Sequence, residues 1–151
     1  MRWQLLFDEL EYGFDELLRQ RSDHAPALAD QASAWGAYSA VTLLCVRAKA
    51  AREPIRVALV NGWEGQLLPR AVGRDWVSGV DTESTSERII ALSAISAATG
   101  SSTYAMVDAE PTPATLYAVL QLWKQRHQPL AVTTARHRFQ GHLDEVVADS
   151  I

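Results

Sequence analysis

Apolar side chains recur at alternating spacings of four and three residues near the start of the chain. The positions that form this seam are Trp3, Phe7, Leu10, Phe14 and Leu17. The period predicts an α-helix over residues 2–20 with a continuous apolar face. Such a face either packs on its own domain or pairs with another subunit, because two heptads are fewer than a convincing coiled coil needs.

A second helix is expected after the polar break at residues 21–26. Ser22 or Asp23 could cap its first turn, and Pro26 lies close to that turn. The stretch that follows is rich in alanine and ends near Arg52 with basic residues, which favour a helix C-terminus. We therefore expect residues 1–53 to form a helical region.

From Pro54 the pattern changes to short runs with strand character. Turn signals separate these runs at Asn61-Gly62, which favours a type I′ hairpin turn, at residues 73–75, at the polar loop 81–86 and at Ser93-Ala94. Gly65 and Gly79 lie inside runs and suggest bulges or bends that curl a small sheet. The sequence thus predicts an α+β fold in which helices lead into a small SH3/Sm-like antiparallel β barrel over residues 54–98.

The last third of the chain predicts a further helix and a hairpin. Residues 99–112 have the composition of a linker, and Thr112 with Pro113 restarts a helix that ends near His127. Its apolar face combines Leu116, Val119, Leu120 and Trp123. Pro129 then opens a strand, a turn and a second strand, so residues 113–151 are expected to form a helix plus a β hairpin.

This last segment resembles the barrel segment in the order of its elements. Aligning the two matches Pro54 with Pro129, Val57 with Val132, Gly65 with Gly141 and Leu67 with Leu143. The match predicts an internal repeat whose second copy is partial. Because a two-stranded hairpin is marginally stable alone in water, we expect it to pack on the first barrel, on the helices or on another subunit.

Composition and charge restrict the class of protein. Of the 151 residues 48% are hydrophobic and 21% are charged, which is typical of a globular chain, and the formal net charge is −4. An acidic chain is a poor candidate for binding nucleic acid through phosphate contacts alone. The first residues are acidic and periodic, unlike a signal peptide, and no apolar run is long enough to span a bilayer. We expect a cytoplasmic protein that does not bind membranes.

The residues that usually carry chemistry are sparse. The single Cys45 is expected to be a buried structural thiol, and the histidines at 24, 127, 137 and 142 lack other ligands at a recognised metal spacing. The sequence has no phosphate-binding glycine loop, nucleophile elbow or paired carboxylates in a defined context. We therefore predict that the chain is not an enzyme and uses no cofactor, metal or small-molecule substrate.

Three segments carry a family resemblance: MRWQLLFDEL at the start, VGRDWV at residues 72–77 and IIALSAISAA at residues 89–98. In these segments the chain resembles an actinobacterial family that opens with an MRW-x-x-LF helix and carries an Sm-like unit. Some members are labelled as Fis-type transcription regulators. The sequence has no helix-turn-helix with a basic recognition helix that would support this label.

The Sm-like resemblance implies a possible RNA surface with an aromatic platform and a basic rim. The residues that could supply it are Arg56, Arg70, Arg74, Arg88 and Trp63. Trp76 is expected in the core, because aromatic residues in short alternating strands usually face the interior. The Asp-x-x-x-Asn pattern of Sm proteins is absent, and residues 72–76 stand in its place.

Two functions remain open at this point. The first is assembly with itself or with a protein partner, through the seam of Trp3, Phe7, Leu10, Phe14 and Leu17 and through the open edges of the last hairpin. The alternative is a regulatory Sm-like module that binds RNA or single-stranded nucleic acid.

Overall fold

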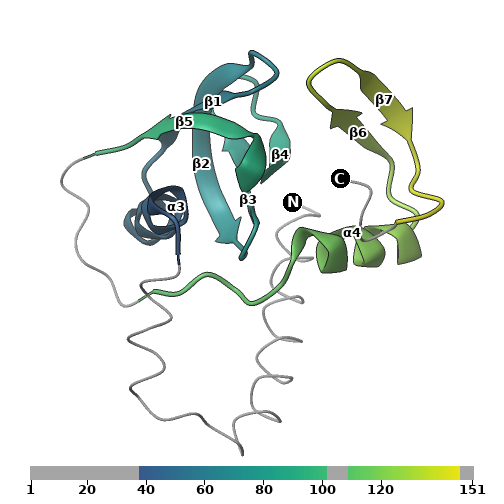
Figure 1. The fold of residues 1–151 in the computed structure, drawn as a ribbon, viewed down its shortest axis with the longest axis horizontal. Helices are drawn as coiled ribbons and strands as arrows, with labels where there is room; N and C mark the ends of the chain where they lie inside the picture. Colours follow the sequence, from purple (N-terminus) through teal and green to yellow (C-terminus); the bar gives the residue numbers. More distant parts are fainter. Residues whose placement is uncertain (1–37, 102–108, 147–151) are drawn as a thin grey trace, which may run out of the picture.

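We describe a computed structural model of the chain in which residues 38–101 and 109–146 are placed. The predicted helix over residues 2–20 and its apolar seam lie outside these residues. The described chain is α+β: one helix leads into a five-stranded antiparallel sheet, and a second helix leads into a separate two-stranded hairpin (Figure 1). None of its helices is long and apolar enough to cross a lipid bilayer.

Helix α3 spans Ala40–Ala51 and leads directly into the sheet. It begins at Ser39, whose extended backbone ends the preceding segment and whose hydroxyl accepts a hydrogen bond from the Thr42 N–H at 3.2 Å. It ends at Arg52, which adopts a left-handed conformation. The expected C-terminus is thus confirmed. The predicted start at Ser22 or Asp23 lies outside the described residues, but a helix continuous through Ser39 is wrong, because Ser39 is extended and caps α3.

The sheet contains all five strands expected between residues 54 and 98. They are β1 (Ile55–Leu59), β2 (Glu64–Val72), β3 (Trp76–Asp81), β4 (Glu87–Ala91) and β5 (Ile95–Thr99), with a 3₁₀ turn η1 (Leu92–Ala94) before β5. Their order is β4-β3-β2-β1-β5, and every neighbouring pair is antiparallel. β4 and β5 form the two edges and do not pair with each other, so the sheet is not a closed barrel.

The β1–β2 connection differs from the predicted type I′ turn. That turn needs a positive φ at both central residues, but of Asn61 and Gly62 only Gly62 has one, at 87°. The Gly62 N–H donates to the Leu59 carbonyl at 3.0 Å, and the Asn61 side chain accepts from the Trp63 N–H at 3.0 Å. The Asn61 side chain therefore closes a longer loop instead of forming a two-residue turn.

One of the two irregularities that bend the sheet lies opposite Gly79, as expected, and neither lies at Gly65. Between β2 and β3 the pairing passes from Pro69 with Gly79 to Ala71 with Ser78, which leaves Arg70 as an extra residue. A second shift occurs between Ala58 and Leu59, where β1 pairs with β5. Such bulges increase the twist of a strand, so the bend of β2 is set at Arg70.

Side chains on the two faces of the sheet belong to two different hydrophobic clusters. Ile55, Val57, Leu67, Val77 and Ile90 pack with Cys45, Val46 and Ala48 of α3. On the opposite face Ala71 and Trp76 pack with Leu116, Val119 and Trp123 of helix α4 (Leu116–Gln125). Because adjacent strand residues point to opposite faces, α3 and α4 cover different sides of one sheet. Trp76 is 1% exposed, which confirms that it is a core residue.

The end of the predicted linker is attached to the sheet. The Thr112 N–H donates to the Val72 carbonyl at 2.8 Å, and the Trp76 indole donates to the Ala114 carbonyl at 3.0 Å. Helix α4 then begins after Thr115, whose hydroxyl accepts from the Ala118 N–H. The expected apolar face is confirmed, but a start at Thr112 is wrong, because residues 112–115 are not helical and Thr112 and Ala114 hydrogen-bond to the sheet instead.

The terminal hairpin forms where Pro129 predicts it. Strands β6 (Leu130–Thr133) and β7 (Arg138–Gly141) make a two-stranded sheet of their own. Val132 pairs with Phe139 and Leu130 pairs with Gly141, whereas in the first hairpin Val57 pairs with Gly65. The residues matched by the internal alignment thus occupy different registers, and the repeat itself stays a prediction.

Two glycines offer a matched test of how tightly β2 and β3 approach. A Cβ on Gly79 would lie 2.4 Å from the Leu68 carbonyl oxygen and 2.9 Å from the Leu67 side chain, whereas one on Gly141 would meet nothing within 4 Å. We expect Gly79→Ala to lower the free energy of unfolding by about 1–3 kcal/mol, because the backbone must shift to relieve the overlap. Gly141→Ala should change it by less than about 1 kcal/mol. Urea unfolding of both variants measures the difference, and equal losses would contradict the close approach.

Candidate functional site

Two of the five residues expected to form a nucleic-acid surface contact each other. The guanidinium carbon of Arg88 lies 4.6 Å from the centre of the Trp63 ring, which is a cation–π contact. The same ring lies against Gly65, where a Cβ would come within 2.5 Å of it. These residues belong to the sheet face that α3 covers, because Trp63 packs against that hydrophobic cluster. A base could stack on this side of Trp63 only after Arg88 had moved away.

Asp81 fixes the position of Arg88. One carboxylate oxygen of this buried residue accepts hydrogen bonds from the Arg88 guanidinium at 3.1 and 3.2 Å and from the Ser84 hydroxyl at 2.8 Å. The other accepts from the backbone N–H of Glu83 at 3.0 Å. The Ser84 hydrogen bond is the largest cause that lowers the pKa of Asp81 to about 2, and the Glu83 N–H and Arg88 add to it against the opposing effect of burial. Arg88 is therefore held within the fold.

The remaining three arginines are exposed and lie apart. Arg56 is on β1 and faces Glu64 at 3.9 Å, in a pair so exposed that it contributes little. Arg70 is the extra residue of the β2 bulge, and Arg74 lies in the β2–β3 turn. Trp63 and Arg74 flank opposite ends of β2, on the order of 30 Å apart along the strand. The structure brings Trp63 and Arg88 together but does not gather the five residues on one surface.

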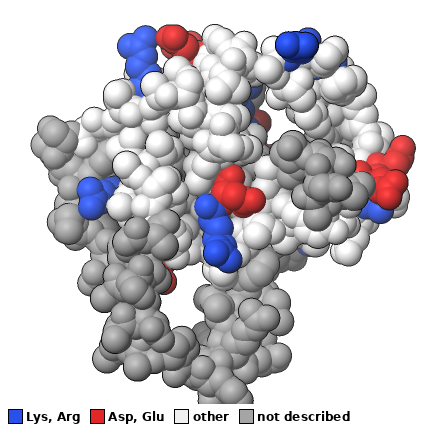
Figure 2. Space-filling model, in the orientation of Figure 1, with Lys and Arg blue, Asp and Glu red and all other residues white. Residues whose placement is uncertain are grey.

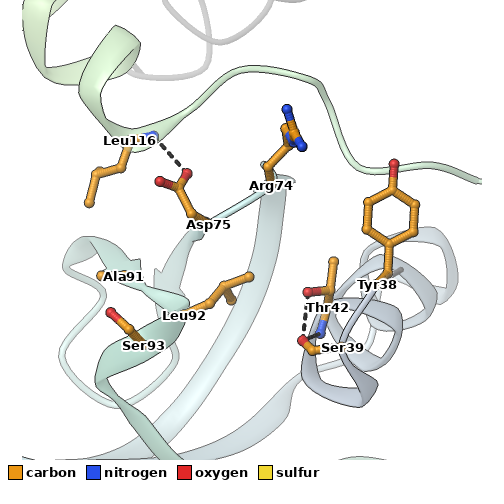
Figure 3. Close-up of a pocket in the computed structure, with 9 residues that line it drawn as sticks. All are labelled: Tyr38, Ser39, Thr42, Arg74, Asp75, Ala91, Leu92, Ser93 and Leu116. Carbon is orange, nitrogen blue, oxygen red and sulfur yellow. Dashed lines mark hydrogen bonds between the residues drawn. The ribbon is translucent and has the colours of Figure 1, made fainter. Parts of the chain in front are cut away.

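A pocket of about 440 Å³ lies where the ends of α3 and α4 meet the β2–β3 turn (Figure 3). Asp75 turns toward α4 and accepts a hydrogen bond from the Leu116 N–H at 2.8 Å. Ser39 and Thr42 are hydrogen-bonded to each other at 2.8 Å on the α3 side. These polar groups cap helices, and the lining residues include no histidine, cysteine or lysine that could act with them in acid–base or nucleophilic chemistry.

The described part of the chain contains no candidate site for metal binding or for thiol chemistry. No three of its His, Cys, Asp and Glu side chains lie close enough together to hold a metal ion. Cys45 is completely buried, as expected, and burial raises the pKa of its thiol to about 12. A thiol that stays protonated and inaccessible is a packing residue.

The two edges of the five-stranded sheet differ in how they are protected. Edge strand β4 begins with the charged residues Glu87 and Arg88, whereas β5, at the other edge, reads ISAAT and carries neither charge nor proline. Within the described residues β5 pairs only with β1, and Ser96, Ala97 and Thr99 are exposed. Uncharged edge strands readily pair with another chain. β5 is thus a candidate assembly edge.

The terminal hairpin is the other surface with an unusual composition. Every residue of β7 is exposed, and Phe139 and Val132 are 60% and 39% exposed. Basic residues surround them, since the chain from Pro111 to Leu143 contains no aspartate or glutamate. Sequence reasoning expected open edges on this hairpin but missed its exposed rings and the β5 edge. The absence of charge in residues 95–99 and of acids in residues 111–143 was the signal that could have revealed them.

Comparison with known proteins adds no further assignment. No family model, curated protein or solved structure matches this chain. The resemblance to the actinobacterial family therefore stays a prediction, and function has to be argued from the surfaces themselves.

The contacts of Asp81 predict a measurable dependence of stability on pH. Its pKa is lowered on folding, so its contribution is complete above the unfolded pKa near 4 and is lost as the pH falls through about 2. Asp81→Asn should lower the free energy of unfolding at pH 7 by on the order of 2 kcal/mol. Urea titrations should show that the difference in free energy of unfolding from the native chain becomes smaller between pH 5 and pH 3.

Glu64→Gln is the matched control for this substitution, because the Glu64 side chain is 65% exposed and pairs loosely with Arg56. We expect a change within about 0.5 kcal/mol at every pH. If the difference in free energy of unfolding between the native chain and Asp81→Asn stayed unchanged down to pH 3, the charge of the Asp81 carboxylate would not be what stabilises the fold.

Proposed function

We propose that this protein is a non-enzymatic assembly module that associates with itself through the outer edge of β5. The observation that carries the proposal is the composition of that edge, Ile95–Thr99, which has no charge, proline or glycine to oppose pairing. We also propose a cytoplasmic location, where an unpaired cysteine stays reduced. The proposal includes no cofactor and no small-molecule substrate.

Antiparallel pairing of β5 with β5 of a second copy would satisfy the backbone groups at this edge. A strand that pairs with its own copy about a twofold axis makes the same contacts in both directions, so the assembly closes at two subunits. The side chains along the edge are small, which lets two backbones approach to the usual strand spacing of about 4.8 Å. The charged start of β4 opposes the same pairing at the other edge.

We further propose that the five-stranded sheet is an opened SH3/Sm-like barrel. Three features support this. The last strand, β5, returns to pair with the first, β1, which brings the ends of a meander toward closure. The 3₁₀ turn η1 redirects the chain between the two edge strands, and α3 packs against the cluster that a barrel would enclose. Membership of the actinobacterial family belongs to the same proposal.

Assembly through the β5 edge predicts the oligomeric states of the native chain and of two variants. The native chain should have twice the 16.6 kDa mass of one chain in multi-angle light scattering. Ala97→Lys places a charge at the exposed edge and should give a monomer. Ala50→Lys adds the same charge at an exposed position of α3 and should leave the dimer unchanged. A monomeric native chain at high micromolar concentration would reject self-assembly, and a dimeric Ala97→Lys variant would reject this edge.

The predicted apolar seam near the start of the chain is a second contributor to assembly. Phe7→Glu with Leu10→Glu should weaken association if residues 2–20 pair between subunits, because a charge replaces apolar contact. A chain that combines these changes with Ala97→Lys tests whether the seam and the β5 edge contribute separately to association. A dimer that survives the double substitution while circular dichroism shows an intact fold would assign the seam to packing within one subunit.

A further inference from the structure

One stretch of this acidic chain has a strongly basic character. From Pro111 to Leu143 the sequence contains no aspartate or glutamate, although the whole chain has a net charge of −4. The charged residues of the stretch are Lys124, Arg126, Arg136 and Arg138, accompanied by histidines at 127, 137 and 142. Figure 2 shows Lys and Arg atoms at the outer end of the hairpin, where no acidic atoms lie on the visible face. Of these residues, Arg136 and Arg138 belong to the hairpin, whereas Lys124 and Arg126 lie at the end of α4.

The hairpin also presents an aromatic pair to solvent. The rings of His137 and Phe139 are stacked with their centres 5.8 Å apart and their planes at 27°. Phe139 is 60% exposed, and its cross-strand partner Val132 is 39% exposed. The turn that carries His137 is fixed, because the Thr134 N–H donates to the His137 carbonyl at 2.8 Å and the Thr134 hydroxyl accepts from the His137 N–H at 3.1 Å. The backbone that carries the His137 ring is therefore ordered by local hydrogen bonds.

Two guanidinium groups lie next to these rings in the sequence. Arg136 and Arg138 are exposed, and within the described residues neither forms an ion pair with an acidic side chain. Arg138 pairs with Thr133 across the hairpin and so points to the face opposite Phe139, while Arg136 lies in the turn. Positive charge therefore brackets the aromatic pair at the outer end of the hairpin.

We propose that residues Arg136–Phe139 form a contact surface for single-stranded nucleic acid. The Phe139 and His137 rings would stack on unpaired bases, and the two arginines would contact the phosphates that follow the backbone around the turn. The apolar area is limited to Phe139 and Val132, which is far below the roughly 800 Å² per partner of a standard protein interface. It is sufficient for one or two bases. A duplex would offer the phosphates but not the base faces.

This surface is separate from the arginines of the sheet and independent of the β5 edge. Trp63 and Arg88 are engaged with Gly65 and Asp81, whereas the hairpin rings are open to solvent. The competing occupant is an acidic and apolar segment of a second copy, such as residues 1–20 with Phe7 and Leu10. The experiment includes that segment as a probe.

The test is a fluorescence anisotropy titration with the full chain at constant pH. The probes are labelled oligothymidine and oligouridine of about fifteen nucleotides, a hairpin duplex of equal charge, and a labelled peptide of residues 1–20. We expect both single strands to bind more tightly than the duplex and the peptide. Two to four phosphate contacts should weaken single-strand binding roughly sevenfold to fiftyfold between about 50 and 200 mM KCl.

Four variants separate the contributions of the ring and of the arginines to binding. Phe139→Ala should weaken single-strand binding by about fivefold or more with little change in duplex binding, and Phe139→Tyr should restore it. Arg136→Ala with Arg138→Ala should flatten the salt dependence by about 1.4 in the logarithmic slope. Arg56→Ala with Arg70→Ala removes the same charge from exposed sites on the sheet and should leave binding nearly unchanged.

Several results would overturn the proposal. One is the absence of oligonucleotide binding at about 50 mM KCl. Another is an equal loss of single-strand affinity in the hairpin and sheet double-arginine variants, and a third is a Phe139→Ala variant that binds single strands as tightly as the native chain. Tighter binding of the peptide than of the oligonucleotides would assign the hairpin to a second copy instead. Because the Ala97→Lys chain can be titrated in parallel, failure of the assembly edge and failure of this surface give different results.

Discussion

Strand β3 must bury both of its faces, and most of the structure follows from that requirement. Its six residues are almost entirely enclosed, with Val77 pointing to one side and Trp76 to the other. A strand buried on both faces needs a layer on each, and the chain supplies α3 before the sheet and α4 after it. The bond from the Trp76 indole to the Ala114 carbonyl secures the second layer, because it ties the entry to α4 to the strand that α4 covers.

The same requirement separates the surfaces that are available for partners. The inner strands of the sheet are β3, β2 and β1, so β4 and β5 are its edges, and the hairpin that follows α4 forms a sheet of its own. The sheet contributes an uncharged edge, and the hairpin contributes exposed rings with basic neighbours. The proposed contact through the β5 backbone and the proposed contact through the hairpin side chains therefore use different residues.

The sequence predicted the parts of the fold that depend on local signals. Strand alternation and turns placed all five strands and η1, and the spacing of Leu116, Val119 and Trp123 identified the buried face of α4. The start of α4 was misplaced although Thr115 caps it locally. Asp75 also accepts from the Leu116 N–H across forty-one positions, and residues 112–115 alone do not reveal this long-range contact. The Trp63–Arg88 contact was missed for the same reason, since it needs β4 beside the β1–β2 loop.

The enclosed thiol of Cys45 has a practical meaning for anyone who studies this chain. It is the only cysteine in the sequence, it is fully covered by the contact between α3 and the sheet, and its high pKa keeps it protonated. An alkylating reagent can reach it only when that contact opens. The rate at which the reagent modifies Cys45 therefore reports how often α3 leaves the sheet. No substitution in the chain is needed for this measurement.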